Sequence, residues 1–258
     1  ADARPVAGVA RVTARVTGAA APLADVAAHP DAPAAAPFAT AIVPVYNKRA
    51  FIEAAAGSVI AAALAGAEAP GDVEVLLVDH QSTDGSREAC ERLAAAHPSV
   101  ARVLVHPAGG TISDVRNAGA AAARGGWLVF FDADIVVPAD YFGALRAVAA
   151  RTGAPVLGCE YALPDDTHWS ERVWDALHLD FAEGPRRLLW GGNLAVRAEA
   201  LRDAGGWASH LAVGEDTELC ARLARGGRRI LGTPVLKVVH LGNPKSVRDF
   251  YRKQVWHG

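Results

Sequence analysis

The sequence has little that would place the protein in a specialised structural class. Its 258 residues include only three cysteines, Cys90, Cys159 and Cys220, which are far apart and lack CxxC spacing. This argues against a disulfide framework and a zinc site, and it favours a reducing compartment. No apolar run is long enough to span a bilayer. The net charge of −2 gives no reason to expect nucleic acid as a partner.

A glycine-rich phosphate loop is also missing after the first expected strand, residues 38–46. The chain continues there as PVYNKR, residues 44–49, without a GxGxxG pattern. This excludes a Rossmann dehydrogenase, in which such a loop follows the first strand. It also argues against a sugar nucleotidyltransferase, a class that often carries a glycine-rich loop with Lys or Arg at this point.

The composition changes at Phe38 and again near Pro138. Residues 1–37 are rich in Ala and Pro, and we expect a poorly ordered N-terminal extension. From residue 38 to 136 apolar strands alternate with helical segments, which predicts a Rossmann-like, mostly parallel sheet flanked by helices. The expected strands are 38–46, 71–80, 100–106 and 125–135, and the expected helices are 49–67, 86–96 and part of 109–123.

Residues 137–258 follow a less regular pattern and predict a mixed second half. The segments expected there are a helix at 138–150, a strand at 154–163, an irregular stretch at 164–190, a strand and short helix at 191–206, a helix at 214–227, one or two strands at 228–242, and a basic, aromatic tail at 246–258. We therefore expect one domain of two halves after the extension, not two separate domains.

Polar residues gather where the expected parallel strands end. Pro44, Tyr46 and Asn47 follow the first strand, and Asp79 ends the second. Ligands of open α/β sheets bind outside the carboxyl ends of the strands, so these side chains are candidates for one site. Asp79 also has a simpler interpretation as a turn residue, because the sequence after it is rich in side chains that hydrogen-bond local backbone.

Two carboxylates, Asp132 and Asp134, interrupt the apolar run WLVFFDADIVVP at residues 127–138. A solvated strand end explains one such residue better than two. Oxygen ligands at this spacing suit Mg²⁺ or Mn²⁺ held mainly through one carboxylate and the phosphates of a substrate. The ion would neutralise the charge of a departing diphosphate.

Six motifs in order make the chain similar to a known family. IVPVYN, LLVDHQSTDGS, ISDVRNAGAAAARGGWLVFFDADI, GGNLAVR, GEDTELCARL and VVHLG resemble family-2 glycosyltransferases of the GT-A fold. The resemblance covers residues 38–258 and implies an inverting, metal-dependent hexosyltransferase. It implies a nucleotide-sugar-binding half at 38–136 and an acceptor-binding half at 137–258.

The resemblance also implies roles for particular residues. Those expected to bind the nucleotide sugar are Pro44, Tyr46, Asn47, Asp79, His80, Arg116, Asp132, Ala133 and Asp134. Asp132, Asp134 and His240 are the expected ligands of Mn²⁺ or Mg²⁺, and Trp190, Gly192 and Asn193 are expected near the donor or acceptor sugar. A core position is an equal alternative for Trp190, and a hydrogen-bonded strand end is the simpler interpretation of His240.

Glu215 and Asp216 begin the helix at 214–227. Acids at a helix N-terminus can simply complement the helix dipole. Beside the resemblance, Asp216 is the candidate general base that takes the proton of the acceptor hydroxyl, with Glu215 as a second candidate or a support.

The sequence departs from the family pattern at His80, where many members carry an acid that contacts the nucleobase. A UDP-sugar is favoured, and GDP- or dTDP-sugars stay open.

The expected acceptor is a glycan or a lipid-linked molecule, at the cytoplasmic face of a bacterial membrane. In the tail, basic and aromatic residues alternate; packing on the body is favoured, with a lid or peripheral membrane contact as alternatives. A non-catalytic nucleotide-sugar or glycan-binding relative is the alternative function.

Overall fold

The structure, a computed structural model, describes residues 36–164, 167–169, 171–172, 182–249 and 251. The expected extension at 1–37 lies outside these residues except for its last two positions. Most of the tail at 246–258 also lies outside them. The expectations for these two segments therefore stay predictions.

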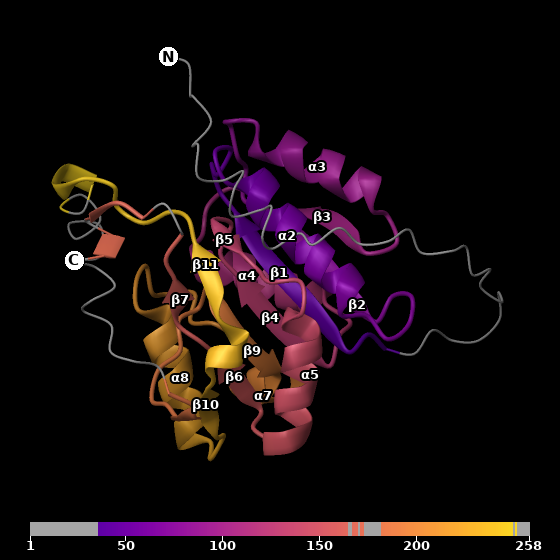
Figure 1. The fold of residues 1–258 in the computed structure, drawn as a ribbon, viewed down its shortest axis with the longest axis vertical. Helices are drawn as coiled ribbons and strands as arrows, with labels where there is room; N and C mark the ends of the chain where they lie inside the picture. Colours follow the sequence, from indigo (N-terminus) through magenta and orange to yellow (C-terminus); the bar gives the residue numbers. More distant parts are fainter. Residues whose placement is uncertain (1–35, 165–166, 170, 173–181, 250, 252–258) are drawn as a thin grey trace.

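The main sheet follows the α/β pattern that the sequence predicts. In the described part of the chain it has eight strands in the order β3-β2-β1-β4-β9-β6-β10-β8 (Figure 1). Parallel pairing joins β1 (Ala39–Val45), β2 (Val73–Asp79), β3 (Ala101–Val105) and β4 (Trp127–Phe131). The other half contains β6 (Val156–Gly158), β8 (Gly184–Pro185), β9 (Asn193–Arg197) and β10 (Ile230–Gly232), with β9 antiparallel to both β4 and β6.

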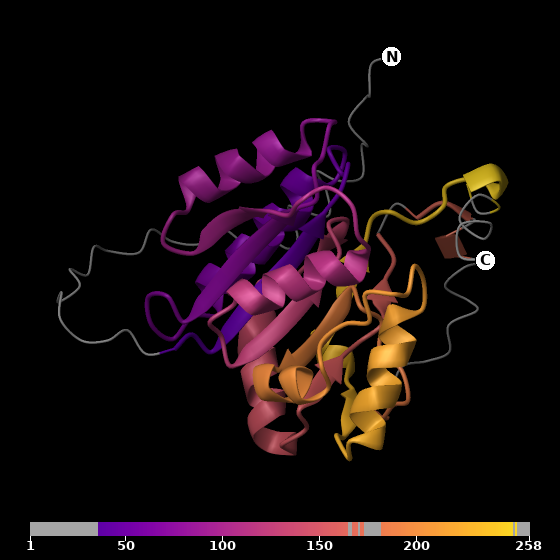
Figure 2. The same ribbon diagram turned by 180° about the vertical axis from the view of Figure 1, so that it is seen from behind.

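Helices cover both faces of this sheet because its strands are apolar on both sides (Figures 1 and 2). In β1, Ala41 and Val43 pack on one face and Ile42 on the other, as the alternation of strand side chains requires. The helices α2 (Ile52–Ala65), α3 (Ser86–Ala96) and α5 (Tyr141–Thr152) cover the first face. The helices α4 (Ile112–Ala122), α7 (Ala198–Asp203) and α8 (Glu215–Arg225) cover the second.

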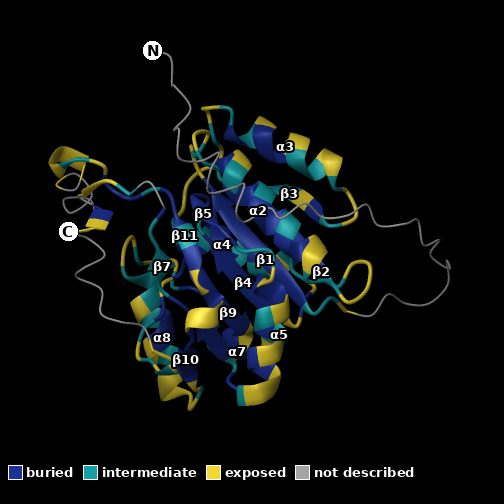
Figure 3. Ribbon diagram, in the orientation of Figure 1, coloured by how far each residue is buried: buried dark blue, intermediate teal, exposed yellow. Residues whose placement is uncertain are grey.

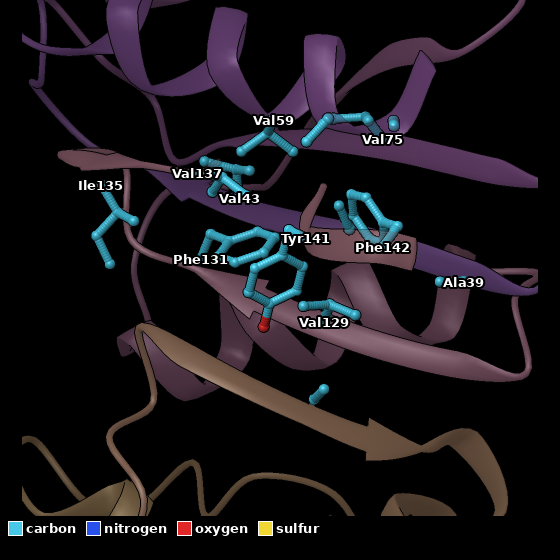
Figure 4. Packing of buried hydrophobic residues seen from close by; sticks show 14 of the residues in the cluster. Ala39, Val43, Val59, Val75, Val129, Phe131, Ile135, Val137, Tyr141 and Phe142 are labelled. Atoms are coloured by element: carbon cyan, nitrogen blue, oxygen red, sulfur yellow. The ribbon is translucent and has the colours of Figure 1, made fainter. Parts of the chain in front are cut away.

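Aromatic rings fill the core between the sheet and α5. Phe131 meets Tyr141 edge to face with ring centroids 5.0 Å apart, and Phe142 packs beside both (Figure 4). All three are fully buried. In Figure 3 the sheet is buried and the outer faces of the helices are exposed. This packing fixes the end of β4, directly before the predicted acidic pair.

A second, three-stranded sheet carries the other side of the predicted site. It has the order β5-β11-β7, with β5 (Ile135–Val136), β7 (Tyr161–Ala162) and β11 (Val238–His240). The strand expected at 154–163 is thus divided between two sheets as β6 and β7. The segment at 228–242 likewise contains β10, the 3₁₀ helix η1 (Pro234–Leu236) and β11. Both segments cross from the main sheet to the small one.

Candidate active site

Most of the predicted site residues line one cavity of about 1240 Å³. It opens beside the carboxyl ends of β1 and β4 and is bounded by the start of α8 and by β11. The predicted residues on its wall are Pro44, Tyr46, His80, Arg116, Asp132, Ala133, Asp134, Trp190, Gly192, Glu215, Asp216 and His240. The structure therefore brings the two halves of the sequence together at one place.

Asp79 and Asn47, which were expected to bind the nucleotide sugar, are not among the residues that line the cavity. Asp79 is fully buried, where it pairs with Arg87 Nε at 2.8 Å and accepts the N–H of Ser82. Asn47 Oδ1 accepts the N–H of Thr83 at 2.8 Å, and the Asn47 N–H donates to Ser82 Oγ at 3.1 Å. Asn47 thereby ties the loop after β1 to the loop after β2, whereas Asp79 ties the end of β2 to the loop that follows it and to α3.

Asn193, which was expected near the donor or acceptor sugar, is also not among the residues that line the cavity. The side chain is fully buried. Its Oδ1 accepts the Tyr141 hydroxyl at 2.9 Å, and its Nδ2 donates to the carbonyls of Cys159 and Leu236 at 3.1 and 2.9 Å. A side-chain amide engaged in this way stabilises the junction of the two sheets.

The acidic pair lies in a tight turn between β4 and β5. The Ile135 N–H donates to the Asp132 carbonyl at 3.1 Å, which ends the strand and turns the chain toward the small sheet. Both carboxylates line the cavity, but the Asp134 side chain is only 6% exposed and that of Asp132 36%. Charge from neighbouring side chains compensates the burial of Asp134.

Two cationic or protonatable groups face Asp134. Lys48 Nζ lies 2.5 Å from Asp134 Oδ2, and His240 Nε2 lies 3.6 Å from Oδ1. Burial lowers the pKa of Lys48, but Asp134 and then Asp132 outweigh this and raise it above the ordinary value. Lys48 is therefore an ammonium ion, a residue of the site that the sequence analysis did not single out although it follows the IVPVYN motif.

Glycines let the backbone approach both carboxylates. A Cβ on Gly192 would meet the Asp132 carboxylate and the Tyr161 hydroxyl, and a Cβ on Gly242 would meet the carboxylate of Asp134. A larger residue at either position would push the acid out of place. Gly192, which was expected near the donor or acceptor sugar, thus lies against Asp132 of the acidic pair.

Arg116 joins the acidic pair to the start of α8. Its guanidinium is 4% exposed, with Nη2 3.2 Å from Asp132 Oδ1 and Nη1 2.7 Å from Glu215 Oε1. It also stacks on Trp207, with Cζ 4.5 Å from the ring centroid. Arg116 was expected to bind the nucleotide sugar; its contacts in the structure are with Asp132, Glu215 and Trp207, which fit a residue that supports the site.

The start of α8 presents two acids in different settings. Gly214 has a φ of 82° and turns the chain into the helix. Glu215 is paired with Arg116, whereas Asp216 accepts the N–H of Thr217 at 2.7 Å and that of Gly191 at 3.4 Å. Asp216 has no ion pair with the residues that the structure describes.

A group of rings occupies the wall beyond the ends of β1 and β2. Tyr46 is 59% exposed and lies edge-on to His80, and His80 lies beside His106. His106 Nδ1 is 2.9 Å from the Pro107 carbonyl and 3.2 Å from His80 Nδ1. Since a carbonyl only accepts, the contact with Pro107 places an N–H at His106 Nδ1, so that His80 Nδ1 is the acceptor in the second contact and the N–H of His80 lies at Nε2.

His106 and Tyr161 are further residues that the sequence analysis missed. His106 follows β3 as Asp79 ends β2, so its place after a third parallel strand was a usable signal. Tyr161 lies in β7, with its ring centroid 5.0 Å from that of His240. Burial and then the charge of Asp132 raise the pKa of the Tyr161 hydroxyl well above its ordinary value, so it stays protonated.

The donor set suits a divalent cation, although the described side chains contain no group of three or more His, Cys, Asp or Glu arranged to hold a metal. The residues that line the cavity carry five carboxylates against one lysine and one arginine. Asp132, Asp134 and His240 are hard or borderline ligands, and a magnesium or manganese ion commonly takes only one or two protein ligands beside substrate phosphates.

Known proteins share this arrangement of the chain. The model of the family described as Glycosyl transferase family 2 matches residues 40–204. An uncharacterized glycosyltransferase of Bacillus subtilis, EpsJ, is 32% identical over 48% of the chain, and glycosyltransferase AglE of Haloferax volcanii is 25% identical over 74%. The chain covers only 34% and 62% of the lengths of these two proteins.

A solved structure confirms the expected GT-A fold. The mannosyltransferase PcManGT from Pyrobaculum calidifontis, solved in complex with GDP-Man and Mn²⁺, superposes with a TM-score of 0.65 at 23% identity. The match covers 97% of this chain and 69% of the mannosyltransferase. In the described part of the chain, no helix combines the length and the apolar character needed to cross a bilayer.

Proposed function

The chain belongs to glycosyl transferase family 2, and we propose that it transfers a sugar from a nucleotide-sugar donor to a hydroxyl group of a glycan or lipid-linked acceptor. One observation carries the proposal. A single cavity holds the acidic pair Asp132 and Asp134, a carboxylate at a helix start that is not paired with a cation among the described residues, and an arginine between them. These are the parts that a displacement at an anomeric carbon needs.

Asp216 would act as the general base. It would take the proton of the acceptor hydroxyl as that oxygen bonds to the anomeric carbon and the bond to the diphosphate oxygen breaks. Attack on the face opposite the leaving group inverts the configuration. Glu215 is less suited to this step, because its carboxylate is already engaged by Arg116, whose Nη1 lies 2.7 Å from Glu215 Oε1.

Asp134, with Asp132 and His240, would hold Mn²⁺ or Mg²⁺. When bound, the ion would neutralise charge on the departing nucleoside diphosphate. Arg116 would keep Asp132 in place through its contact of 3.2 Å. The Mn²⁺ and GDP-Man of the similar mannosyltransferase support a divalent ion and a nucleotide-sugar donor here.

The rings of Tyr46 and His80 would receive the nucleobase. The N–H at His80 Nε2 is a donor, and it suits the carbonyl oxygens of uracil, thymine or guanine better than the amino group of cytosine. Gln81 Nε2 donates to the His106 carbonyl at 3.0 Å, which leaves the Gln81 Oε1 to accept an imide N–H. A uridine donor is favoured, and guanosine and thymidine donors also fit.

Trp190, 37% exposed on the cavity wall, would stack on a sugar ring. We propose that the reaction takes place at the cytoplasmic face of a bacterial membrane, in polysaccharide synthesis. Peripheral membrane contact through the tail at 246–258 is an alternative to its packing on the body. Removing residues 246–258 tests the alternative role of this tail as a lid, because loss of a lid would weaken nucleotide binding.

The proposed function is tested first by thermal unfolding with UDP-, GDP- and dTDP-sugars, each with and without Mn²⁺. A ligand of the folded state must raise the melting temperature. We expect one nucleotide to stabilise the protein in the presence of Mn²⁺ and to be released as the diphosphate when an acceptor is added. Binding without hydrolysis or transfer across an acceptor panel would indicate a non-catalytic relative, and pyrophosphate release from a nucleoside triphosphate would indicate a nucleotidyltransferase.

A further inference from the structure

The positive charge of Lys48 lies beside Asp134, the carboxylate that is best placed to bind a metal ion. Its ammonium nitrogen lies 2.5 Å from Asp134 Oδ2, and the Asp134 side chain is almost fully buried. A divalent ion on the same oxygen would sit about 2 Å from it. The ammonium and the ion would then be close enough to repel strongly in a partly desolvated site.

The backbone of Lys48 is held in place, whereas its side chain is free to move. Its N–H donates to Ser86 Oγ at 2.8 Å, and its carbonyl accepts the N–H groups of Phe51 and Ile52 at 2.9 and 2.8 Å, at the start of α2. The side chain itself is 38% exposed and lines the cavity. The ammonium can therefore leave Asp134 on its flexible four-carbon stem while the backbone and α2 stay in place.

Arg116 cannot move in the same way. Its guanidinium is held by Asp132 and Glu215 and stacks on Trp207. Lys48 and Arg116 are the lysine and arginine among the described residues that line the cavity. Lys48 is thus the cation able to follow an incoming anion, and a diphosphate is a strong acceptor for a lysine ammonium.

We propose that Lys48 is an exchangeable counterion of Asp134, which it holds in the empty site and releases to the diphosphate of the donor, so that the divalent ion binds Asp134 together with the nucleotide. The inference rests on the proposed function. It makes binding of the metal depend on the nucleotide, and it makes Lys48 a diphosphate-binding residue. The two ligands would then enter as a pair.

The test is a titration of Mn²⁺ followed by the electron paramagnetic resonance signal of the free ion, with the protein alone and with UDP, GDP or dTDP. In the wild type, Mn²⁺ alone binds weakly, and the matching nucleotide strengthens its binding. Lys48→Met removes the competing charge. We expect this variant to bind Mn²⁺ alone about tenfold more tightly than the wild type does. The factor by which nucleotide strengthens Mn²⁺ binding should fall by a similar amount.

Two further variants separate this role from a structural one. Lys48→Arg keeps a cation and should retain the nucleotide dependence. Arg49→Met removes a neighbouring charge that pairs with Glu53 and does not line the cavity, so it should leave Mn²⁺ binding unchanged. Melting temperatures verify folding, and Lys48→Gln replaces Lys48→Met if the latter does not fold.

Two negative results have different meanings. If the wild type shows nucleotide-dependent Mn²⁺ binding but Lys48→Met binds Mn²⁺ alone no more tightly, the counterion role is wrong and the proposed function stands. If the wild type binds neither Mn²⁺ nor any of the three nucleotides, the proposed function and the role of Lys48 are both wrong.

Discussion

Asp134 and Asp216 face the same cavity, but their surroundings differ in charge. Asp134 is nearly buried and has a lysine ammonium and a histidine ring beside it. Asp216 is held by two backbone N–H groups, one of them at 3.4 Å, and has no ion pair in the described part of the chain. The two carboxylates therefore offer a ligand in the cavity different surroundings: a cation compensates the charge of Asp134, and no described cation is paired with Asp216.

Arg116 makes these two regions depend on each other. It pairs with Asp132 in the turn after β4 and with Glu215 beside Asp216. Arg116 and Glu215 are 99 residues apart in the sequence. The arginine thereby fixes the distance between the part of the site that would receive the leaving group and the part that would activate the acceptor.

Asp134→Asn should have the largest effect. It removes the charge that would hold the divalent ion, and we expect transfer to fall on the order of 1000-fold, since such ions supply several kcal/mol of charge stabilisation. The stabilisation by Mn²⁺ with nucleotide should disappear in thermal unfolding as well. Normal Mn²⁺-dependent stabilisation of this variant would show that the ion binds elsewhere.

Arg116→Gln tests the link between the two regions. It leaves Asp132 and Glu215 without their buried cation, and we expect the free energy of unfolding to fall by about 3 kcal/mol. Arg151→Gln is the matched control, because Arg151 pairs with Glu183 on the surface, and its effect on the free energy of unfolding should be much smaller than that of Arg116→Gln. Urea denaturation measures both, and equal losses would argue against a structural role for Arg116.

Asn193→Ala separates fold from site. The substitution leaves the Tyr141 hydroxyl and two carbonyls without a partner, so unfolding should become easier by about 2 kcal/mol. Because Asn193 is outside the cavity, the affinity for nucleotide should stay within about twofold of the wild type. A large loss of affinity with unchanged stability would return Asn193 to the sugar-binding role.

His80→Asn should have the smallest effect. It would remove the one hydrogen bond proposed between His80 and the base, away from Asp134 and Asp216, and we expect UDP to bind about three- to tenfold more weakly. Binding of CDP should change little, because its amino group does not match the N–H of His80. Calorimetric titration of both nucleotides measures the difference, and an equal loss for the two would rule out base recognition by His80.

The sequence predicts the first half of the molecule well because parallel strands obey a simple rule. Their carboxyl ends meet at one edge, so Tyr46 and the acidic pair could be placed together from the order of strands alone. Asp79 satisfies the same rule yet points into the core, because Arg87 on the next helix pairs with it. Spacing along the chain does not show whether such a carboxylate will face the edge of the sheet or pair with a side chain in the core.

The second half was harder to predict because its segments pass between two sheets. Asn193 belongs to a motif that was expected near a sugar, but its partners come from α5, the end of β6 and η1, which are remote in sequence. Lys48 reaches Asp134 across 86 residues, a contact that exists only once β1 and β4 are paired. Long-range pairing of this kind leaves no periodic signal in the sequence.

The most direct test compares Asp216→Asn with Glu215→Gln in one assay of nucleoside diphosphate release, using the donor that stabilises the wild type with Mn²⁺. Asp216→Asn should bind this donor as the wild type does but release the diphosphate between about 100- and 10,000-fold more slowly, the range typical of a lost general base. Glu215→Gln should retain more activity. Release by Asp216→Asn at the wild-type rate, with donor binding intact, would contradict the assignment of Asp216 as the base.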